Sequence, residues 1–412
     1  MKVFIPGDIQ ASLKTAEPGS LVLGAFSREH NVATVTGLLS PADTEQGMAG
    51  QPVLAVVGRQ SGDQPLFLDR RAGNGWFDGA GAPLEVETYD NGQFFKRTPF
   101  DSQTRAHLQK KRVLIVGAGS VGAPMGLELA KAGVGGIIVL DKDILEIHNC
   151  MRHVLGVSYI GWPKVTAFAH FLKGQAPMTE CIPVHGDLFS GRRRRLQRMM
   201  EETRPTHILA VTDSLRVQYL CQRLALHYQL PLMAVWCDNN AVEGEIFMWE
   251  PGQAPAWKPG RAQRGCYACM RDPDTVTITR SASFDYSSDD PDSYGGEPAL
   301  GTFINRINNI AAIFLTAWML GDCPAPSRLA GILDEHYRGK GLQYIRLGGP
   351  YPFEVEGQLT AKEPWAVEWY RVMKREACPF CGNQDANREV LFPEDAPHVD
   401  APECWEAFQK VS

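Results

Sequence analysis

The feature that most constrains the fold of this chain is a strand–turn–helix–strand unit that begins at Arg112. An apolar strand at residues 112–116 leads into the glycine-rich run GAGSVG, and helical sequence follows to about Ala132. A second buried strand at residues 136–140 ends at Asp141. A unit of this order, with a glycine loop at its first turn, predicts the start of a parallel α/β sheet.

The alternation of strands and helices continues toward the C-terminus. Further strands are predicted at residues 180–185, 207–212 and 232–237, and helices at 164–173, 192–202 and 215–228. Two later strands, expected to be antiparallel, are predicted at residues 244–250 and 343–347, with a long buried helix at 303–320 between them. We therefore expect an α/β domain with a mixed sheet.

Residues 1 to about 96 have a different character. Short apolar stretches at residues 20–23 and 53–57 are separated by turn signals rich in glycine, proline and asparagine. This pattern predicts a small β-rich or mixed N-terminal domain, in which we find no catalytic constellation. Elsewhere, the polar and acidic residues 282–298 predict a loop, and the arginine run at 192–195 predicts a solvated helix face.

The glycine loop indicates a nucleotide site. Gly117, Gly119 and Gly122 fit the pattern GxGxxG between a strand and a helix, and Ser120 lies within it. Glycines let the backbone approach a phosphate, and the helix N-terminus presents unpaired N–H groups to it. Asp141, 19 residues after Gly122, ends the next strand, where a carboxylate can accept hydrogen bonds from ribose. A tight strand–helix turn without a ligand is the structural alternative.

Four polar residues favour a nucleoside triphosphate over a dinucleotide. Substitution at an α-phosphate needs more positive charge than a bound pyrophosphate, together with a divalent cation. Asn149, Arg152 and Lys164 supply donors and charge on the C-terminal side of the predicted sheet, and Asp213 is placed to hold Mg²⁺. Each of these residues taken alone is also consistent with a surface salt bridge.

Two tight cysteine pairs predict a metal site. Among ten cysteines, Cys266 and Cys269 form one CxxC pair, and Cys378 and Cys381 form the other. Four thiolates suit tetrahedral Zn²⁺, and a closed shell of this kind leaves no open position, so we interpret the zinc as structural. Two unrelated pairs of reduced cysteines are the alternative.

Composition and charge exclude several classes of protein. The 412 residues are 44% hydrophobic and 21% charged, which is typical of a soluble folded protein of two or three domains. A net charge of −6 gives no basis for general binding to nucleic acid or anionic membranes. The longest apolar run, residues 310–320, is too short to cross a bilayer, and the N-terminus lacks a signal-peptide core, so we expect a cytoplasmic protein.

Taken in order, these motifs resemble the ThiF/MoeB/HesA superfamily, which contains ubiquitin-activating enzymes and their bacterial relatives. The resemblance covers about residues 97–385 and rests on the glycine loop, Asp141–Arg152, Lys164, Asp213 and the first CxxC pair. It implies an N-terminal accessory domain at 1–96, a Rossmann-like adenylation domain at 97–385 and a tail at 386–412. The NxxRH form at 149–153 most resembles members from bacterial ubiquitin-like conjugation operons.

The resemblance also implies roles for single residues. Asp141 would bind the ATP ribose, Asn149, Arg152 and Lys164 would contact the phosphates, and Asp213 would bind Mg²⁺. Members of the superfamily form homodimers and lend an arginine across the interface, a part that falls to Arg97 or Arg105 here. One position departs from the pattern: Gln218 stands five residues after Asp213, where the superfamily often has arginine, and Arg216 lies nearby.

A nucleophilic cysteine is harder to assign. Enzymes of this kind that pass a protein onward usually carry one after the first CxxC pair, but no cysteine lies between Met270 and Phe303. The enzyme therefore stops at the acyl-adenylate, or uses a cysteine elsewhere, or has lost the step. Cys237 and Cys404 are the candidates for the second case, whereas Cys150 and Cys221 are predicted to be packing residues.

The sequence thus predicts an ATP-dependent enzyme that adenylates the C-terminal carboxylate of a ubiquitin-like protein with an extended tail. A conjugating enzyme would be a further partner. The first alternative is adenylation of a sulfur-carrier protein or a peptide. An NAD-dependent oxidoreductase would use the same glycine loop but would leave Arg152, Lys164 and Asp213 unexplained. A non-catalytic scaffold would tolerate substitution of those residues.

Overall fold

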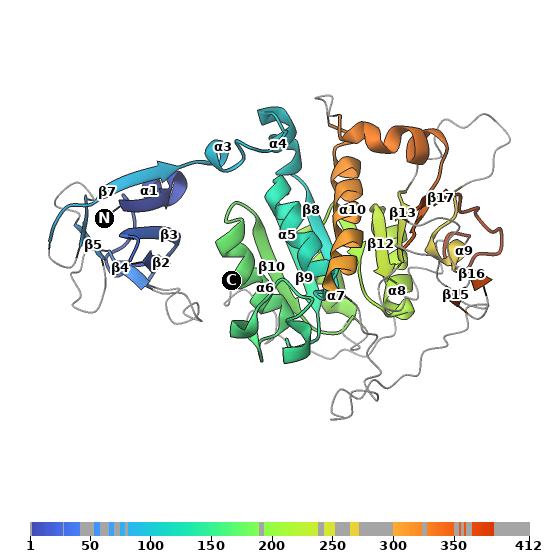
Figure 1. The fold of residues 1–412 in the computed structure, drawn as a ribbon, viewed down its shortest axis with the longest axis horizontal. Coiled ribbons are helices and arrows are strands. Elements are labelled where there is room, and N and C mark those ends of the chain that lie inside the picture. The colour runs from blue at the N-terminus through green and yellow to red at the C-terminus, as the bar shows by residue number, and fades with distance from the viewer. Residues whose placement is uncertain are drawn as a thin grey trace. The chain divides into compact units, whose positions relative to one another are not determined.

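The computed structural model divides the chain into two compact units on either side of Ser102 (Figure 1). The structure describes residues 2–27, 29–41, 53–57, 66–69, 75–78, 81–188, 193–237, 243–251, 264–271, 300–323, 328–349, 354–355, 358–359 and 365–382. The predicted loop at 282–298, the predicted tail at 386–412 and Cys404 lie outside these residues.

Unit 1 is a five-stranded mixed sheet of order β4-β2-β3-β1-β7. Its elements are β1 (Lys2–Pro6), α1 (Gly7–Ser12), β2 (Leu21–Ser27), β3 (Val32–Leu39), β4 (Val53–Val56), β7 (Glu85–Tyr89) and α3 (Asn91–Phe94), with a separate hairpin of β5 (Leu66–Asp69) and β6 (Gly75–Asp78). Strand β1 runs parallel to both β3 and β7, whereas β2 is antiparallel to its neighbours. The buried core includes Val3, Leu13 and Trp76. The prediction of a small β-rich or mixed N-terminal domain is confirmed.

Unit 2 is built on an eight-stranded sheet of order β10-β9-β8-β11-β12-β13-β14-β17. The strands are β8 (Arg112–Val116), β9 (Gly136–Asp141), β10 (Glu180–His185), β11 (His207–Ala210), β12 (Leu232–Cys237), β13 (Gly244–Trp249), β14 (Tyr344–Leu347) and β17 (Val367–Tyr370). The first five strands in spatial order are parallel, and β13, β14 and β17 pair antiparallel. A further two-stranded ladder joins β15 (Glu354–Val355) and β16 (Gln358–Leu359). The predicted mixed α/β sheet is therefore confirmed.

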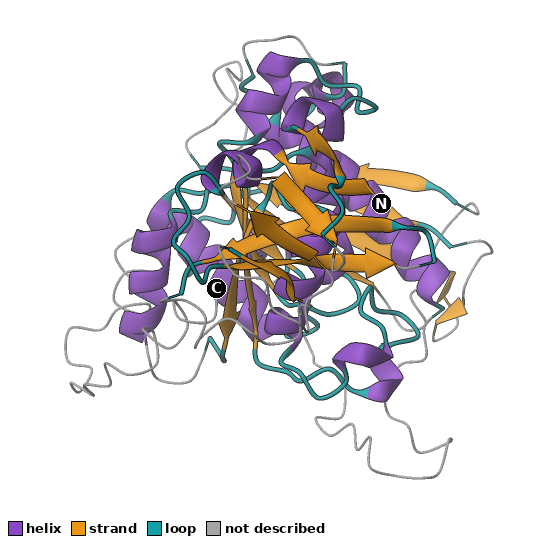
Figure 2. Ribbon diagram, turned by 90° about the vertical axis from the view of Figure 1, so that its left-hand side faces the viewer, coloured by secondary structure: helices purple, strands orange, loops and turns teal. Residues whose placement is uncertain are grey.

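Helices flank the strands of the large sheet on both sides (Figure 2). They are α4 (Ser102–Leu108), α5 (Gly122–Ala132), α6 (Lys164–Gln175), α7 (Arg193–Thr203), α8 (Leu215–Tyr228), α9 (Tyr267–Met270) and α10 (Gly301–Met319), with the shorter η1 (Ile147–Asn149), η2 (Val157–Tyr159), η5 (Ala330–Leu333) and η6 (Asp334–Gly339). An added Cβ at Gly244 would lie 2.5 Å from Ile307 of α10, and the Phe247 ring packs 5.5 Å from that of Tyr267 in α9. Residues an odd number apart on β13 point to opposite faces, so α10 and α9 cover opposite faces of the sheet.

The topology brings the predicted nucleotide residues to one edge of the sheet. Parallel neighbours β9, β8, β11 and β12 all end at the same edge. Asp141 is the last residue of β9, Gly117 follows β8, Asp213 follows β11, and Cys237 ends β12. The carboxyl ends of such strands are the usual place for a ligand in an open α/β sheet.

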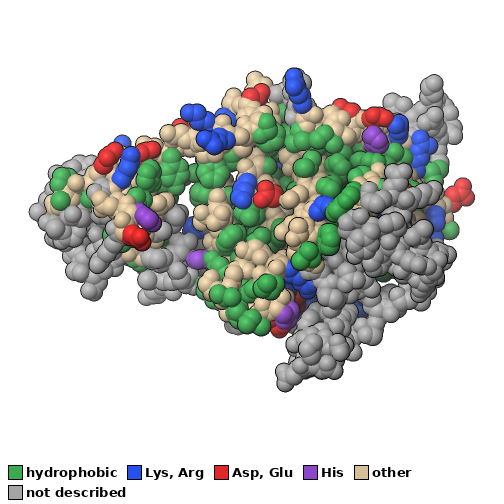
Figure 3. All heavy atoms as spheres, in the orientation of Figure 1, with side chains coloured by type: hydrophobic (Ala, Val, Ile, Leu, Met, Phe, Trp, Pro, Cys, Tyr) green, Lys and Arg blue, Asp and Glu red, His purple; other side chains and the backbone are tan. Residues whose placement is uncertain are grey.

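None of the described helices is long and apolar enough to cross a membrane. On the face drawn in Figure 3, the described lysine and arginine side chains are scattered among acidic, polar and apolar ones. The arginine run leads into α7, which begins at Arg193.

Buried His207 at the start of β11 gives the first testable prediction. Its side chain is 6% exposed, and burial, followed by the charge of Lys111, lowers its pKa to about 3. Between the ordinary histidine pKa of about 6.5 and pH 3, the unfolded chain therefore binds a proton that the folded chain does not. Stability should fall by up to about 1.4 kcal/mol per pH unit on acidification because of this group alone.

The variant His207→Leu lacks this group, so its free energy of unfolding should depend less steeply on pH below about 6. Urea denaturation of both proteins at several pH values between 7 and 5 measures the difference. Equal slopes for the two proteins would show that His207 is protonated in the folded state or is not buried.

Candidate nucleotide site and cysteine cluster

The glycine loop between β8 and α5 is held so tightly that two of its glycines have no room for a side chain. Gly117 has a φ of +108°, and a Cβ there would lie 2.7 Å from the Val211 carbonyl oxygen. A Cβ on Gly122 would lie 1.9 Å from the Gly117 oxygen. Gly119 differs, because a Cβ there would meet no described atom within 4 Å. The loop is thus packed at both ends and open at its centre, where a ligand can approach the backbone.

Three side chains from different elements fix the backbone of this loop. The Ala118 N–H donates to Asp141 Oδ2 at 2.6 Å, and His153 Nε2 donates to the Ala118 carbonyl at 2.7 Å. Asn308 Nδ2, from buried helix α10, donates to the Ser120 carbonyl at 2.8 Å. Because the N–H and the C=O of Ala118, which belong to successive peptide groups, are both hydrogen-bonded, the orientation of the loop is set before any ligand binds.

His153 is neutral in this arrangement. A carbonyl only accepts, so Nε2 carries the proton, and Nδ1 accepts from the Leu155 N–H at 3.1 Å. Burial lowers the His153 pKa below its ordinary value, and the nearby charge of Lys164 lowers it further. The NxxRH motif at residues 149–153 includes His153, but the sequence did not predict its hydrogen bond to the glycine loop.

Asp141 and Lys164 are connected through Asp143. Asp141 Oδ1 accepts from the Asp143 N–H at 2.9 Å, and Lys164 Nζ donates to Asp143 Oδ2 at 3.1 Å. The Lys164 side chain is only 11% exposed, at the first residue of α6. Each Asp141 oxygen keeps a second lone pair. Asp141 can therefore anchor the loop and still accept from a ribose, while a phosphate would compete with Asp143 for Lys164.

The other predicted site residues lie around this centre. Asn149 caps its own turn, with Oδ1 accepting from the Glu146 N–H at 3.0 Å. Half-buried Arg152 lies beside the start of α10, where its Cα is 3.6 Å from the Cβ position of Gly301. Asp213 is exposed, and among the described residues its carboxylate has no hydrogen-bond or ion-pair partner. The carboxylate is thus available to a cation.

The four predicted metal ligands meet in one cluster. The Sγ atoms of Cys266, Cys269, Cys378 and Cys381 all lie within 4.8 Å of one another. Three Sγ–Sγ distances are 3.9 Å for Cys266–Cys269, 3.6 Å for Cys266–Cys378 and 3.5 Å for Cys269–Cys381. Tetrahedral Zn²⁺ with bonds of about 2.3 Å holds its sulfur atoms about 3.8 Å apart. The cluster therefore has the dimensions of a four-thiolate zinc site.

The cysteines of the cluster shift one another's pKa in both directions. A hydrogen bond from Cys266 lowers the pKa of Cys378 to about 6, and hydrogen bonds from Cys266 and Cys381 lower that of Cys269. The hydrogen bond with Cys269 raises the pKa of Cys266; against the lowering effect of Cys266, Cys269 and burial raise the pKa of Cys381 to about 12. The Arg375 N–H also donates to Cys269 Sγ at 3.4 Å. Phe380, between the second pair of cysteines, packs 5.5 Å from Tyr219 and 3.9 Å beneath the Arg223 guanidinium, both on α8.

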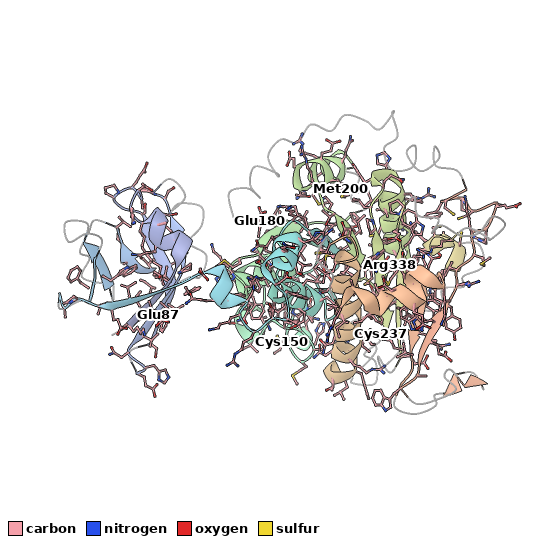
Figure 4. The ribbon with its side chains drawn as sticks, turned by 90° about the horizontal axis from the view of Figure 1, so that it is seen from above. Glu87, Cys150, Glu180, Met200, Cys237 and Arg338 are labelled. Carbon is pink, nitrogen blue, oxygen red and sulfur yellow. The ribbon has the colours of Figure 1, made fainter. Side chains whose placement is uncertain are left out.

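The cysteines outside the cluster divide by burial. Cys221 is fully buried, and burial raises its pKa to about 12, as expected for a packing residue. Half-buried Cys150 donates weakly to the Glu146 carbonyl at 3.8 Å. Half-buried Cys237 ends β12 opposite Gly244, well apart from Cys150 in Figure 4. Of the two candidates for a nucleophilic cysteine, Cys237 is therefore the one among the described residues, and it lies at the edge of the sheet where the predicted nucleotide residues gather.

Comparison with known proteins gives a family match over the region that holds both sites. The model of the ThiF family matches residues 94–330. A similar curated relative is adenylyltransferase and sulfurtransferase uba4 of Emericella nidulans, 30% identical over 321 residues, or 76% of this chain and 61% of the relative. SAMP-activating enzyme E1 of Haloferax volcanii is 28% identical over 167 residues, or 40% of this chain and 55% of the relative.

Other matches are more distant or partial. Adenylyltransferase and sulfurtransferase MOCS3 of Sus scrofa is 28% identical over 183 residues, or 44% of this chain and 36% of the relative. Among solved structures, that of E. coli MccB with ATP has a TM-score of 0.46 at 15% identity, covering 68% of this chain and 69% of that one. The chain spans between 27% and 55% of the length of the first four curated relatives it matches.

Proposed function

Because the chain belongs to the ThiF family, we propose that it uses ATP to adenylate the C-terminal carboxylate of a ubiquitin-like protein. The observation that carries this proposal is the glycine loop, which is open at Gly119 and fixed at Ala118 by Asp141 and His153. A phosphate fits such a loop because N–H groups and a helix N-terminus face it. The relatives named adenylyltransferase and SAMP-activating enzyme E1 support the same chemistry.

The proposed reaction is an in-line substitution at the α-phosphate. A carboxylate oxygen of the substrate attacks the α-phosphorus, and the bond to the bridging oxygen of the β-phosphate breaks, so that pyrophosphate leaves with the electron pair. No protein nucleophile takes part in this step. Positioning and electrostatic stabilisation therefore supply the rate acceleration.

Each predicted site residue has a part in this proposal. Asp141 accepts hydrogen bonds from the ribose, and the N–H groups of residues 119–122, with Ser120, surround the phosphates. Asn149, Arg152 and Lys164 contact the phosphates and offset the charge that builds up on them. Asp213 holds Mg²⁺, which neutralises phosphate charge when bound. Residues 97–385 would form the adenylation domain and residues 1–96 an accessory domain.

We propose that the cysteine cluster binds one structural Zn²⁺, because its Sγ–Sγ distances fit a tetrahedral shell. All four positions around the metal would be filled by thiolates, so the zinc would have no direct part in the reaction. Its effect would be to join the segment after β17 to helix α9.

The biological setting is a finer proposal. The NxxRH motif at residues 149–153 supports a bacterial ubiquitin-like conjugation pathway, with a conjugating enzyme as the next partner. A homodimer would place Arg97 or Arg105 of one protomer in the site of the other. The relatives named sulfurtransferase favour a second candidate substrate, a sulfur-carrier protein. Both substrates would be activated at a C-terminal carboxylate.

ATP–pyrophosphate exchange tests the proposal. A ubiquitin-like protein encoded beside the gene should support exchange, and the same protein with a C-terminal carboxamide should not, because it lacks the attacking oxygen. Asp213→Ala should slow exchange at least about tenfold, whereas Glu202→Ala, which removes an exposed carboxylate from α7, should not. Absence of exchange with any carrier protein, together with tight binding of NAD, would contradict the proposal.

A further inference from the structure

Buried Tyr267 connects the cysteine cluster to helix α8. It lies between the cluster residues Cys266 and Cys269 and is 0% exposed. Its backbone N–H donates to Gln222 Oε1 at 2.8 Å, and its hydroxyl donates to Gln218 Oε1. Because the two glutamines are one helical turn apart on the same side of α8, they hold Tyr267 at both ends.

Gln218 carries the connection on to the nucleotide edge of the sheet. Its Nε2 donates to the Thr212 carbonyl at 2.7 Å, and its side chain is almost fully buried. Thr212 directly precedes Asp213. The same turn packs against the glycine loop, since a Cβ on Gly117 would lie 2.7 Å from the Val211 oxygen and 3.0 Å from Thr212 Cγ2. A continuous chain of buried and part-buried contacts therefore joins the cysteine cluster to the Asp213 turn and the loop.

The chemistry of the amide explains why glutamine suits position 218. An amide side chain can accept with its oxygen and donate with its nitrogen at the same time. Gln218 uses the oxygen for Tyr267 and the nitrogen for Thr212. Glutamate would keep the acceptor and lose the donor, and leucine would lose both. An arginine at this position would only donate, so the Tyr267 hydroxyl would have to accept the hydrogen bond that it donates to Gln218 here.

We propose that Tyr267 and Gln218 are positioning residues through which the zinc site holds the Asp213 turn, so that zinc occupancy and Mg²⁺–nucleotide affinity are linked. This inference rests on the proposed function. Linkage between two binding sites is reciprocal, so bound Mg²⁺–nucleotide should also raise the equilibrium affinity for zinc. Neither residue touches the substrate, and neither is a catalytic residue.

The variant Tyr267→Phe tests the link, because it keeps the ring and removes only the hydroxyl. The matched control is Tyr219→Phe, since the Tyr219 ring packs 5.7 Å from that of Tyr267 and its hydroxyl donates to the Arg271 carbonyl at 2.9 Å. Zinc content and the Kd of a non-hydrolysable ATP analogue, with Mg²⁺ and in Mg²⁺-free buffer, are measured for both variants.

Tyr267→Phe should keep its zinc and weaken Mg²⁺-dependent binding of the analogue by about 3- to 10-fold, with little change in Mg²⁺-free buffer. Tyr219→Phe should bind like the wild type. Gln218→Glu, which keeps the acceptor and loses the donor, should reproduce the effect of Tyr267→Phe, and the double variant should be no weaker than either single one. Unchanged Mg²⁺-dependent affinity in Tyr267→Phe, whatever its thermal stability, would overturn the proposal.

A second test uses only the wild-type protein, so it does not require any variant to fold. The zinc affinity, measured at equilibrium by competition with a colorimetric chelator, should rise by about 3- to 10-fold when Mg²⁺ and the ATP analogue are present. A wild type that supports exchange but has the same zinc affinity with and without nucleotide would refute the link alone. A wild type that binds no nucleotide would refute both the link and the proposed function.

Discussion

Replacing Cys378 with serine is expected to abolish zinc binding and to lower the stability of unit 2 by about 3 kcal/mol, or roughly 6–12 °C in Tm. Serine keeps the size of the side chain but does not supply a thiolate. The remaining three sulfurs would then surround a cavity with an unfilled position, in a cluster whose members Cys266 and Cys378 are buried. Zinc analysis and thermal denaturation measure the two effects.

The matched control is Cys221→Ser. Cys221 is also buried, but it lies on α8 and is not a member of the cluster. The variant should retain about one zinc ion per chain even where it lowers Tm, because the Cys221 sulfur is not a ligand. Equal zinc content in Cys378→Ser and the wild type would contradict the assignment of the cluster. So would a wild-type protein without zinc whose Tm is insensitive to added zinc.

Most of the large sheet could be predicted from the sequence because its signals are local. The strand at 232–237 and the helix at 215–228 have the predicted bounds, since apolar runs and their polar breaks determine them directly. The order in which the strands pair was not predicted, because the βαβ rule gives the hand of each connection and not the place where the order reverses, here at β8. For the N-terminal unit, turn signals predicted strands but not the parallel pairing of β1 with β3 and β7.

The candidate site was predicted less completely, because its side chains depend on contacts between distant residues. Asn308 and Ser120 are 188 residues apart, and only the folded chain shows their hydrogen bond. A signal for Asn308 did exist, since an amide in the middle of a predicted buried helix needs a partner. Gln218 was noted only as a departure from a pattern, because nothing in the sequence connects it to Tyr267.

A single methyl group in the glycine loop should lower ATP affinity at two positions but lower the stability of the protein at only one of them. Gly122→Ala places a Cβ 1.9 Å from the Gly117 oxygen, and since that oxygen is backbone, the loop must shift. We expect a lower Tm and ATP affinity reduced about 100-fold or more, which corresponds to about 2.7 kcal/mol. Gly119→Ala meets no described atom within 4 Å, so the variant should fold with an unchanged Tm. Its ATP affinity should nevertheless fall at least about tenfold, because the methyl group would occupy the space of the phosphates.

Isothermal titration with ATP and thermal denaturation separate these outcomes. Gly174→Ala on α6 is the control, because a Cβ there also meets no described atom within 4 Å, but on an exposed helix surface. It should bind ATP like the wild type. Wild-type affinity in Gly119→Ala would mean that no phosphate approaches the centre of the loop, and the nucleotide site would have to lie elsewhere. A loss of affinity at Gly119 without a loss of stability would indicate the ligand, since no described atom of the protein lies within 4 Å of a Cβ at that position.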